Sequence, residues 1–366
     1  MLAKRVGELP PGEGWIFEPK WDGFRTLVFK DGDELFIQSR DGKPLGRYFP
    51  ELEQVLLAQL PKRCVLDGEI VIARDEALDF DALQMRLHPA ASRVQKLAAE
   101  IPASVVFFDL LCENDRDMCS VPFAKRRERL EKLLSGVEPP LHITPATTDR
   151  KKAADWFRRF EGAGLDGVMA KSPEGTYQPN KRVMFKVKHE READCVVGGF
   201  RWRTDRKGEA VGSLLLGLYD DDDDLHHVGV CTSFTDAKRR ELVKILEPYR
   251  GIALRGHPWR EWAESGAESG TVSRRPGMES RWSQGKDLSW EPIRPELVVQ
   301  VAYDHMQGNR FRHTAQFRRW REDKAPRDCT FEQLEVVPPH ELARIFSADR
   351  RQAAARKGSA GSKKRS

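Results

Sequence analysis

Residues 18–25, with the sequence Glu-Pro-Lys-Trp-Asp-Gly-Phe-Arg, constrain this chain most, because they set four charged side chains between two short apolar runs. Apolar runs on either side of a polar step indicate two strands. Burial disfavours the ammonium form of a lysine, and a lysine without its proton is an amine nucleophile. The stretch therefore predicts that Lys20 is a nucleophile in a cleft, with Arg25 available to hold a carboxylate, ribose or phosphate. The alternative is a hairpin edge whose charged side chains lie in solvent.

Charged side chains also interrupt several later apolar runs. Glu69 lies within the strand-like run 65–73, and Asp166 precedes the run Val-Met-Ala. Lys186 and Lys188 share one face of an alternating stretch. Carboxylates hold Mg²⁺ and cations neutralise phosphate oxygens, so this set favours phosphoryl or nucleotidyl transfer. The alternative is an edge strand with its acids in solvent.

The first half of the chain reads as a mixture of strands and helices. Asp31-Gly32 predicts a hairpin between strands at 24–29 and 34–38. A helix is expected to begin at Pro50 and to end before Pro61. Further strands are predicted at 65–73, 104–111, 165–171 and 182–188. Further helices are predicted at 155–160 and from Pro122 to the residue before Gly136.

The composition changes near Asp194, where short strands with Gly-rich turns begin. Strands are predicted at 195–200, 213–219, 228–233, 297–303 and 311–320, with one helix at 236–249. Five or so strands with one helix fit a small barrel of the OB type. The segment 256–291 is a long loop with four tryptophans, and 350–366 is a basic, Ala- and Gly-rich stretch that we expect to be a disordered tail.

Length, charge and cysteine usage narrow the class of protein. The chain of 366 residues is long enough for two domains. It has no long apolar run and no secretory signal, and its six cysteines form no CxxC pair, so we expect a cytoplasmic protein without a membrane span, zinc site or disulfide framework. Basic clusters with aromatic residues at 310–313 and 318–321 favour a nucleic-acid partner, the alternative for any one cluster being a solvated face.

The motifs as a set resemble those of the covalent nucleotidyltransferases. Residues 20–25 resemble the KxDGxR motif of that superfamily. The other motifs follow in the family's order: 39–42 (Ser-Arg-Asp-Gly), 66–69 (Leu-Asp-Gly-Glu), 106–110 (Val-Phe-Phe-Asp-Leu), 166–171 (Asp-Gly-Val-Met-Ala-Lys), 186–188 (Lys-Val-Lys) and 321–324 (Arg-Glu-Asp-Lys). The chain is most similar to the ATP-dependent DNA ligases, and residues 281–290 and 312–317 resemble the small bacterial ligase C type.

This resemblance implies a reaction and a role for each matched residue. Lys20 would attack the α-phosphorus of ATP to give lysyl-AMP, AMP would pass to the 5′-phosphate of a nick in duplex DNA, and the 3′-hydroxyl would then seal the strand. The implied cofactor is Mg²⁺ or Mn²⁺. The implied contacts are Glu18 and Phe108 with adenine, Arg25 and Arg40 with the ribose and phosphate, Glu69 with ribose or metal, Asp166 with metal, Lys186 and Lys188 with the α-phosphate, and Arg321, Asp323 and Lys324 with pyrophosphate.

The chain departs from the family pattern in two ways. Asp166 replaces the usual Glu, and its shorter side chain draws the carboxylate back by one methylene. Only a short segment precedes Lys20, where many relatives carry an extra DNA-binding domain. We therefore expect the chain to hold DNA through arginines outside the nucleotide site and through the tail. These arginines are Arg201, Arg203, Arg274, Arg275 and Arg281.

The resemblance predicts an α+β fold in three parts. These are an adenylation domain of antiparallel sheets plus helices at 1–189, an OB-fold domain at 190–345 and a disordered basic tail at 346–366. The expected protein is a monomeric, cytoplasmic and nucleoid-associated ligase that acts in DNA repair. Two alternatives remain: an RNA ligase or capping-type nucleotidyltransferase, which would use the same lysine, and a nucleic-acid-binding protein without catalysis.

Overall fold

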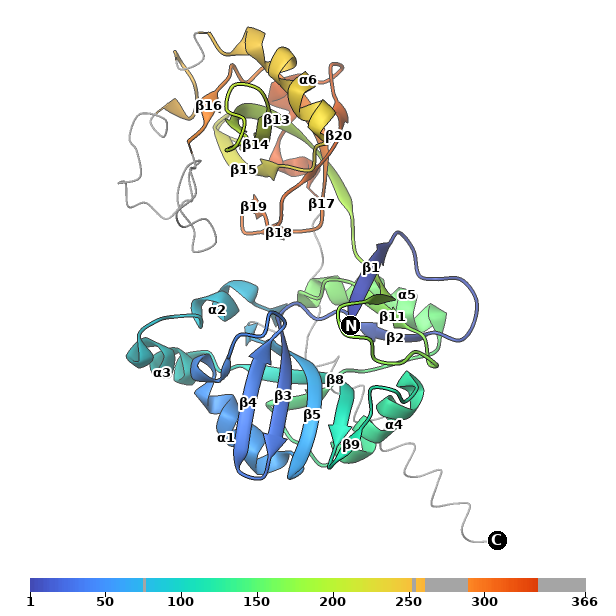
Figure 1. Ribbon diagram of the computed structural model, residues 1–366. Helices are drawn as coiled ribbons and strands as arrows, with labels where there is room; N and C mark the ends of the chain where they lie inside the picture. The colour runs from blue at the N-terminus through green and yellow to red at the C-terminus, as the bar shows by residue number, and fades with distance from the viewer. Residues whose placement is uncertain (75–76, 252–254, 261–288, 335–366) are drawn as a thin grey trace. The chain divides into compact units, whose positions relative to one another are not determined.

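The computed structural model describes residues 1–74, 77–251, 255–260 and 289–334 (Figure 1). These residues form two compact units, the first made of Met1–Lys188 and the second beginning at His189. The predicted tail at 346–366 and most of the predicted Trp-rich loop lie outside the described residues. Within the described part of the chain, no helix combines the length and the apolar composition that crossing a bilayer requires.

Two sheets build the first unit. The smaller has the strand order β1 (Leu2–Val6), β12 (Arg182–Val187), β11 (Val168–Lys171) and β2 (Ile16–Pro19). The larger has the order β10 (Leu141–Ile143), β8 (Ser104–Glu113), β5 (Arg63–Val71), β3 (Phe24–Asp31) and β4 (Glu34–Ser39), with β9 (Arg116–Asp117) paired to β8. A separate ribbon joins β6 (Ala73–Arg74) and β7 (Ala77–Leu78). The β1–β12 and β10–β8 pairs are parallel and the other pairs are antiparallel.

The helices of the first unit are α1 (Pro50–Gln59), α2 (Phe80–Met85), α3 (Ala91–Glu100), α4 (Phe123–Leu133) and α5 (Arg150–Arg159). Buried residues of α1, including Leu52 and Leu56, share a core with Val28 and Leu66 of the larger sheet. The helix predicted at 155–160 was placed too late. It begins at Arg150, because the Asp149 side chain caps it by accepting hydrogen bonds from the first backbone N–H groups.

The segment 18–25 passes from one sheet to the other. It starts in β2 of the smaller sheet and ends in β3 of the larger one, so Lys20 lies where the two sheets face each other. Gly23 is required at the crossing, since a Cβ atom there would lie 2.1 Å from the carbonyl oxygen of Ile70. The predicted hairpin at 24–38 is confirmed, with Asp31 opposite Glu34 at its tip.

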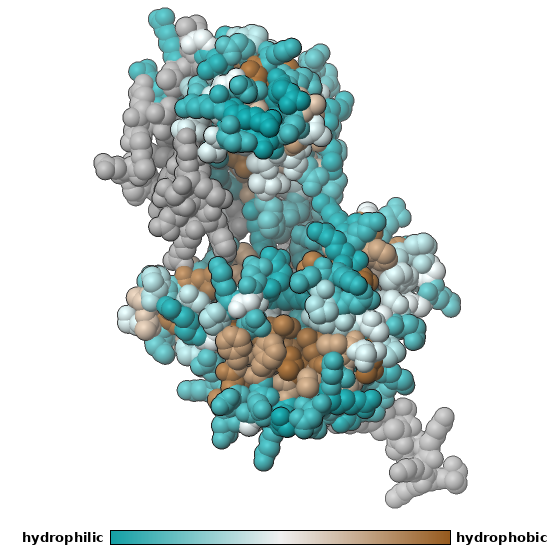
Figure 2. All heavy atoms as spheres, in the orientation of Figure 1, coloured by the Kyte–Doolittle hydropathy of each residue, from teal (hydrophilic) through white to brown (hydrophobic). Residues whose placement is uncertain are grey.

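One face of the larger sheet carries an apolar surface over β3, β4 and β5 (Figure 2). Phe36 is exposed there and its ring lies 6.2 Å from that of Phe29. A shallow hollow beside them is lined by Leu35, Val65 and Cys112 among others. Successive side chains of β4 point to opposite faces of the sheet, so Ile37 packs in the core whereas Phe36 lies outside it.

The described residues of the second unit include a curled antiparallel sheet and a long helix. The strand order is β15 (Leu225–Cys231), β14 (Val211–Tyr219), β13 (Arg191–Trp202), β17 (Val298–Tyr303) and β20 (Gln316–Trp320), with β16 (Glu291–Pro292) paired to β13. A small hairpin joins β18 (Met306–Gln307) to β19 (Arg310–Phe311), and α6 spans Asp236–Leu246. The strand predicted at 311–320 is wrong as one element, because residues 312–315 separate β19 from β20.

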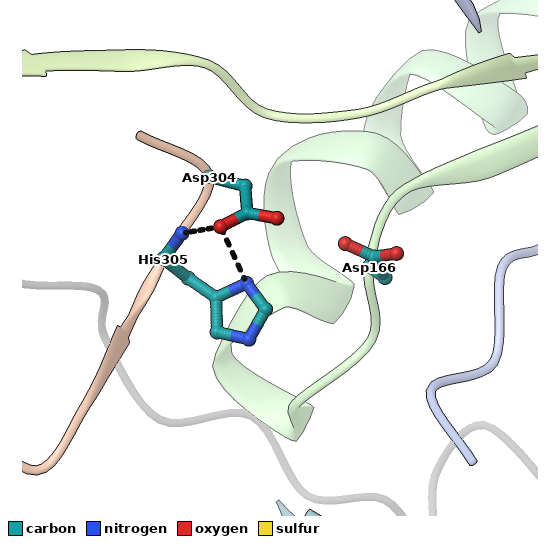
Figure 3. A group of neighbouring side chains, drawn as sticks. All are labelled: Asp166, Asp304 and His305. Carbon is teal, nitrogen blue, oxygen red and sulfur yellow. Dashed lines mark hydrogen bonds and ion pairs between the residues drawn. The ribbon is translucent and has the colours of Figure 1, made fainter. Parts of the chain in front are cut away.

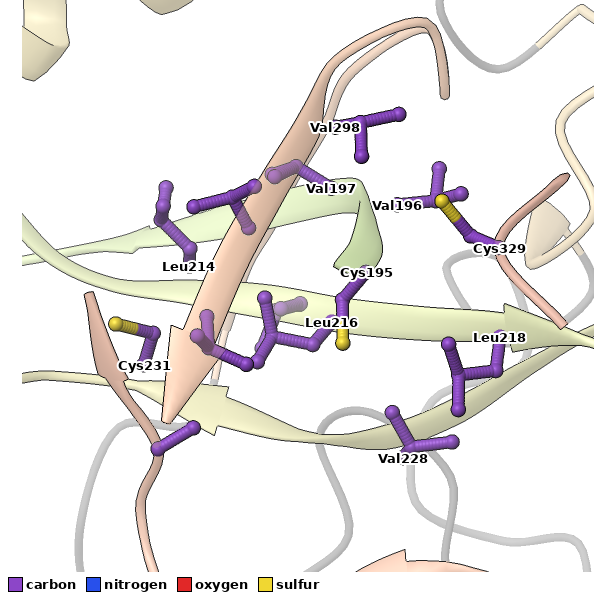
Figure 4. Packing of buried hydrophobic residues seen from close by; sticks show 14 of the residues in the cluster. Cys195, Val196, Val197, Leu214, Leu216, Leu218, Val228, Cys231, Val298 and Cys329 are labelled. Carbon is purple, nitrogen blue, oxygen red and sulfur yellow. The ribbon is translucent and has the colours of Figure 1, made fainter. Parts of the chain in front are cut away.

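The two edges of this sheet meet just before β20. The Ala315 N–H donates to the Val230 carbonyl at 2.8 Å, which joins the β15 edge to the segment that leads into β20. The enclosed core includes aliphatic side chains from β13, β14, β15 and β17, the thiols of Cys195, Cys231 and Cys329, and aromatic rings such as that of Trp259 (Figure 4 shows part of this cluster). All six cysteines of the chain are free thiols.

Candidate active site

The backbone around Lys20 is held by the loop that carries Asp166. The Lys20 N–H donates to the Gly167 carbonyl at 2.9 Å, and the Asp166 N–H donates to the Lys20 carbonyl at 2.9 Å. Gly167 has a φ of +124°, and a Cβ atom there would lie 2.0 Å from the Val187 carbonyl oxygen. The sequence Asp-Gly at 166–167 is therefore needed to bring the acidic loop against the lysine.

The Lys20 side chain ends on the Asp166 carboxylate. Lys20 Nζ lies 2.6 Å from Asp166 Oδ2, and Lys188 Nζ lies 2.7 Å from the same oxygen. Burial acts to raise the pKa of Asp166, but Lys20 and Lys188 outweigh it and hold that pKa below its usual value. The carboxylate is therefore ionised and fixes the lysine amine in one direction.

A third lysine gives this cluster an excess of positive charge. Lys186 makes no ion pair with any described residue, and burial together with the charges of Lys188 and Lys20 lowers its pKa. Three ammonium groups surrounding one carboxylate form a site for an anion. The alternation predicted over 182–188 is confirmed by β12, which places Lys186 in the pocket described below.

Glu69 is a half-buried carboxylate on β5 near the same lysine. Its Oε1 accepts a hydrogen bond from the Gly23 N–H at 3.2 Å, and it forms no ion pair within the described residues. Burial raises the pKa of Glu69 to about 7, although Lys20 and Arg25 act in the opposite direction. A bound divalent cation would relieve the cost of this charge, so Glu69 fits a metal ligand.

Arg25 is held by Asp67 and Tyr177, neither of which was predicted from the sequence to be its partner. Asp67 receives Arg25 Nε at 3.0 Å and Nη2 at 2.6 Å, and the Tyr177 hydroxyl donates to the same carboxylate at 2.8 Å. Although burial opposes its charge, the Asp67 carboxylate raises the pKa of Arg25. Asp67 therefore orients a cation. The sequence did contain a signal for this role, because Asp67 lies two residues before Glu69 and so on the same face of the strand.

Glu18 is deeply buried and compensated by two cations. Lys171 Nζ lies 2.7 Å from Glu18 Oε2, and Arg127 Nη1 lies 3.3 Å from Oε1. Lys171 also lies 4.8 Å from the centre of the Phe108 ring and 4.5 Å from that of Phe123. Neither Lys171 nor Arg127 was a predicted site residue, because their partner on β2 is distant in the sequence.

These side chains surround one cavity of about 310 Å³ in the first unit. Its volume is in the range of small-molecule sites. The predicted residues that line it are Glu18, Lys20, Arg25, Arg40, Glu69, Phe108 and Lys186, joined by Lys171, Met169 and Met184. Asp166 is connected to it through its ion pair with Lys20, and Lys188 through its own ion pair with Asp166. The structure thus brings together nine predicted residues from six separate sequence motifs.

The remaining predicted residues belong to the second unit or fall outside the described residues. Arg321 and Lys324 share the carboxylate of Asp194. Arg201 is half-buried on β13, and Arg203 pairs with Asp205 and Asp236. Arg274, Arg275 and Arg281 lie outside the described residues.

His305 lies just after β17. Its backbone N–H donates to Asp304 Oδ1 at 3.0 Å (Figure 3). His313 Nδ1 lies 2.6 Å from the other oxygen of Asp304, and Arg312 Nη1 lies 3.1 Å from His305 Nε2. These contacts tie the segment after β17 to the segment before β20.

Comparison with known proteins identifies the family. The family model described as "ATP dependent DNA ligase domain" matches residues 1–188, and that described as "ATP dependent DNA ligase C terminal region" matches residues 207–324. The chain is 55% identical over 340 residues to DNA ligase C2 of Mycolicibacterium smegmatis, covering 93% of this chain and 94% of that protein. It is 53% identical to DNA ligase C of Mycobacterium tuberculosis, covering 92% and 93%.

Among solved structures, the fold is similar to that of a Lig E DNA ligase with a TM-score of 0.51 and 16% identity, covering 88% of this chain and 100% of that one. The matched family models together span both compact units. The chain therefore belongs to the ATP-dependent DNA ligases, as an enzyme of the ligase C type.

Proposed function

We propose that this ligase seals nicks in duplex DNA through a covalent lysyl-AMP on Lys20. The observation that carries the proposal is the side chain of Lys20, which opens on the cavity of the first unit and is aimed by the Asp166 carboxylate at 2.6 Å. The amine of Lys20 forms a P–N bond with the α-phosphorus of ATP while the P–O bond to pyrophosphate breaks. Lys20 loses a proton to solvent as its amine forms this bond.

The nucleotide would lie in the cavity of the first unit. Phe108 offers an aromatic face for adenine, and Glu18 offers a fixed carboxylate at its edge. Arg25 is held in place by Asp67 for the ribose or the phosphate, with Arg40 at the rim. Lys186 and Lys188 would stabilise the charge that develops on the α-phosphate.

The donor set fits a divalent metal. Glu69 offers a carboxylate without an ion pair in the described part of the chain, and oxygen ligands suit Mg²⁺ or Mn²⁺. A bound ion would supply neutralisation of phosphate charge. Both lysines contact Asp166 Oδ2, so Lys20 would have to leave that oxygen before it could bind the metal.

The second unit would supply cations for the pyrophosphate and would hold DNA. The curled sheet and α6 support the assignment of an OB-fold domain at 190–345, which follows an adenylation domain at 1–189 and precedes the basic tail at 346–366. Arg321 and Lys324 would orient pyrophosphate. Arg201, Arg203, Arg274, Arg275, Arg281 and the tail would bind the phosphate backbone of nicked duplex DNA. We further propose a monomeric, cytoplasmic and nucleoid-associated enzyme that acts in DNA repair.

The test is sealing of a nicked duplex with a labelled 5′-phosphate, in the presence of ATP and Mg²⁺. Wild type should join the strands, and Lys20→Ala should not. Lys96→Ala is the matched control, because Lys96 is an exposed residue of α3 whose contact is with Glu100. Parallel reactions with GTP and with an RNA nick distinguish DNA ligation from capping and RNA ligation. Sealing by Lys20→Ala at the wild-type rate would refute the proposal.

A further inference from the structure

The two cations of the 321–324 motif share one carboxylate in the second unit. Asp194 Oδ2 accepts from Arg321 Nη1 at 2.7 Å and from Lys324 Nζ at 3.2 Å. Asp194 lies on β13, whereas Arg321 and Lys324 follow β20. A single buried oxygen therefore sets the separation between the guanidinium group and the ammonium group.

Asp194 itself has little freedom to move. It is 8% exposed, and its backbone pairs with Gln300 of β17. The Gln333 side chain clamps it from the other side, accepting from the Asp194 N–H at 2.7 Å and donating to the Asp194 carbonyl at 3.1 Å. Gln333 is anchored in turn by donating to the Thr330 carbonyl at 2.8 Å.

The guanidinium plane of Arg321 is fixed by a second carboxylate as well. Nε and Nη2 donate to the two oxygens of Asp323 at 2.8 and 2.9 Å. Arg321 Nη1 donates to Asp194. After these contacts with described residues, each terminal nitrogen of Arg321 still has one N–H for another acceptor, and the Lys324 ammonium has two. A guanidinium group and an ammonium group that are held in place and still have N–H groups to donate are suited to binding a polyphosphate.

A role in stability alone is a weak explanation for Asp194. A buried ion pair is often no more stabilising than apolar side chains of similar volume, because desolvation of the charges offsets their attraction. Asp194 also leaves its second oxygen, Oδ1, buried without a hydrogen-bond partner among the described residues. A buried carboxylate that is only partly satisfied is explained by the precise orientation it imposes on the two cations.

We propose that Asp194 is a positioning residue for the adenylylation step, which holds Arg321 and Lys324 in the orientation that receives the pyrophosphate of ATP. The inference rests on the proposed function, in which these two cations act on the leaving group. The P–N bond to Lys20 forms as the P–O bond to pyrophosphate breaks, and the electron pair of that bond leaves with pyrophosphate. Cations already oriented before ATP binds would stabilise this charge without reorganisation.

The test separates adenylylation from sealing with Asp194→Asn. Asparagine keeps an oxygen acceptor but removes the charge. We expect lysyl-AMP formation to slow by about tenfold to a hundredfold, a loss typical of a misplaced group. Attack of pyrophosphate on preformed lysyl-AMP should slow by a similar factor, because the two directions share one transition state. Sealing of a nick that already carries 5′-AMP should stay within about twofold of wild type, since it involves no pyrophosphate.

Asp223→Asn is the matched control, because Asp223 also pairs with an arginine of the same unit, Arg327, but is exposed. It should leave both reactions unchanged. A double-mutant cycle with Arg321→Ala provides the second readout. If Asp194 acts partly through Arg321, Asp194→Asn should slow adenylylation by a smaller factor in the Arg321→Ala background than in wild type, because only its action through Lys324 remains there.

Three outcomes would overturn the inference. Wild-type adenylylation by Asp194→Asn, with a defect in Arg321→Ala, would show that Arg321 needs no positioning. Equal losses in adenylylation and in sealing of the 5′-adenylylated nick would indicate a general structural role. Additive losses in the double variant would separate Asp194 from Arg321. Failure of wild type itself to form lysyl-AMP would instead refute the proposed function, which keeps the two failures distinct.

Discussion

Replacing Glu69 by Gln should make the first unit more stable at alkaline pH while impairing catalysis. Glutamine retains the oxygen that accepts from the Gly23 N–H but carries no charge. Burial raises the pKa of Glu69 in the folded protein from 4.5 to about 7. The folded state therefore binds the proton more tightly than the unfolded state does.

The sign of the effect on stability follows from linkage. Below the unfolded pKa of 4.5 the carboxyl is protonated in both states, and the folded protein has no penalty. As pH rises from 4.5 to about 7, the unfolded state ionises first and stability is lost. The full shift corresponds to about 3 kcal/mol at about pH 8, and relaxation of the site reduces the expected gain of Glu69→Gln to about 1–3 kcal/mol.

The assay is denaturant unfolding of the first unit in the presence of a chelator, at about pH 5 and about pH 8, with Glu8→Gln as an exposed control. The gain of Glu69→Gln should be present at the higher pH and nearly absent at the lower one. Addition of Mg²⁺ should stabilise wild type more than the variant. A variant that is no more stable than wild type at about pH 8, or a gain that is the same at both pH values, would refute the reasoning.

Three other predictions follow from the same site and its surroundings. Asp67→Asn breaks the bidentate pair with Arg25, and thermal unfolding should report a loss of about 2–3 kcal/mol together with slower adenylylation; unchanged adenylylation would mean that Arg25 needs no orientation. Gly167→Ala should cost about 2 kcal/mol or more, because of its positive φ and its contact with the Val187 carbonyl, and wild-type stability on denaturation would contradict the local geometry. Binding of a nicked duplex should weaken steeply between about 50 and 200 mM salt in a filter or fluorescence assay, whereas a flat response would exclude the arginine contacts proposed for DNA.

Local chemistry in the sequence was enough to identify most of the candidate site. The hairpin turn at Asp31-Gly32 and the alternation ending at Lys188 report backbone geometry directly, and both are confirmed. Strand-borne charges such as Glu69 and Asp166 stand out because apolar strands seldom carry them without a use. These signals depend on a few neighbouring residues, so they can be recognised in a single sequence without an alignment.

The partners of those residues could not be predicted in the same way. Asp67 meets Arg25 and Tyr177 only through the register of β3 on β5 and the path of the chain before β12. Asp194 meets Arg321 across more than a hundred residues of chain, between β13 and the segment after β20. Pairings of this kind depend on tertiary contacts, which spacing in the sequence does not encode.

The predicted ends of helices and strands were wrong where a side-chain cap or a short interruption sets the end of the element. Asp149 starts α5 five residues ahead of the apolar pattern that predicted it. The interruption between β19 and β20 includes His313, whose ring contacts the Asp304 carboxylate. Both cases show a polar side chain overriding the hydrophobic periodicity of its neighbours.

The most direct test of the account is the site of covalent labelling. Wild-type protein is incubated with α-labelled ATP and Mg²⁺ without DNA, and the labelled peptide is mapped after proteolysis. We expect one AMP on the amine of Lys20, stable to denaturation and released by pyrophosphate. Labelling at another residue, or undiminished labelling of Lys20→Ala, would contradict the assignment of Lys20 as the nucleophile.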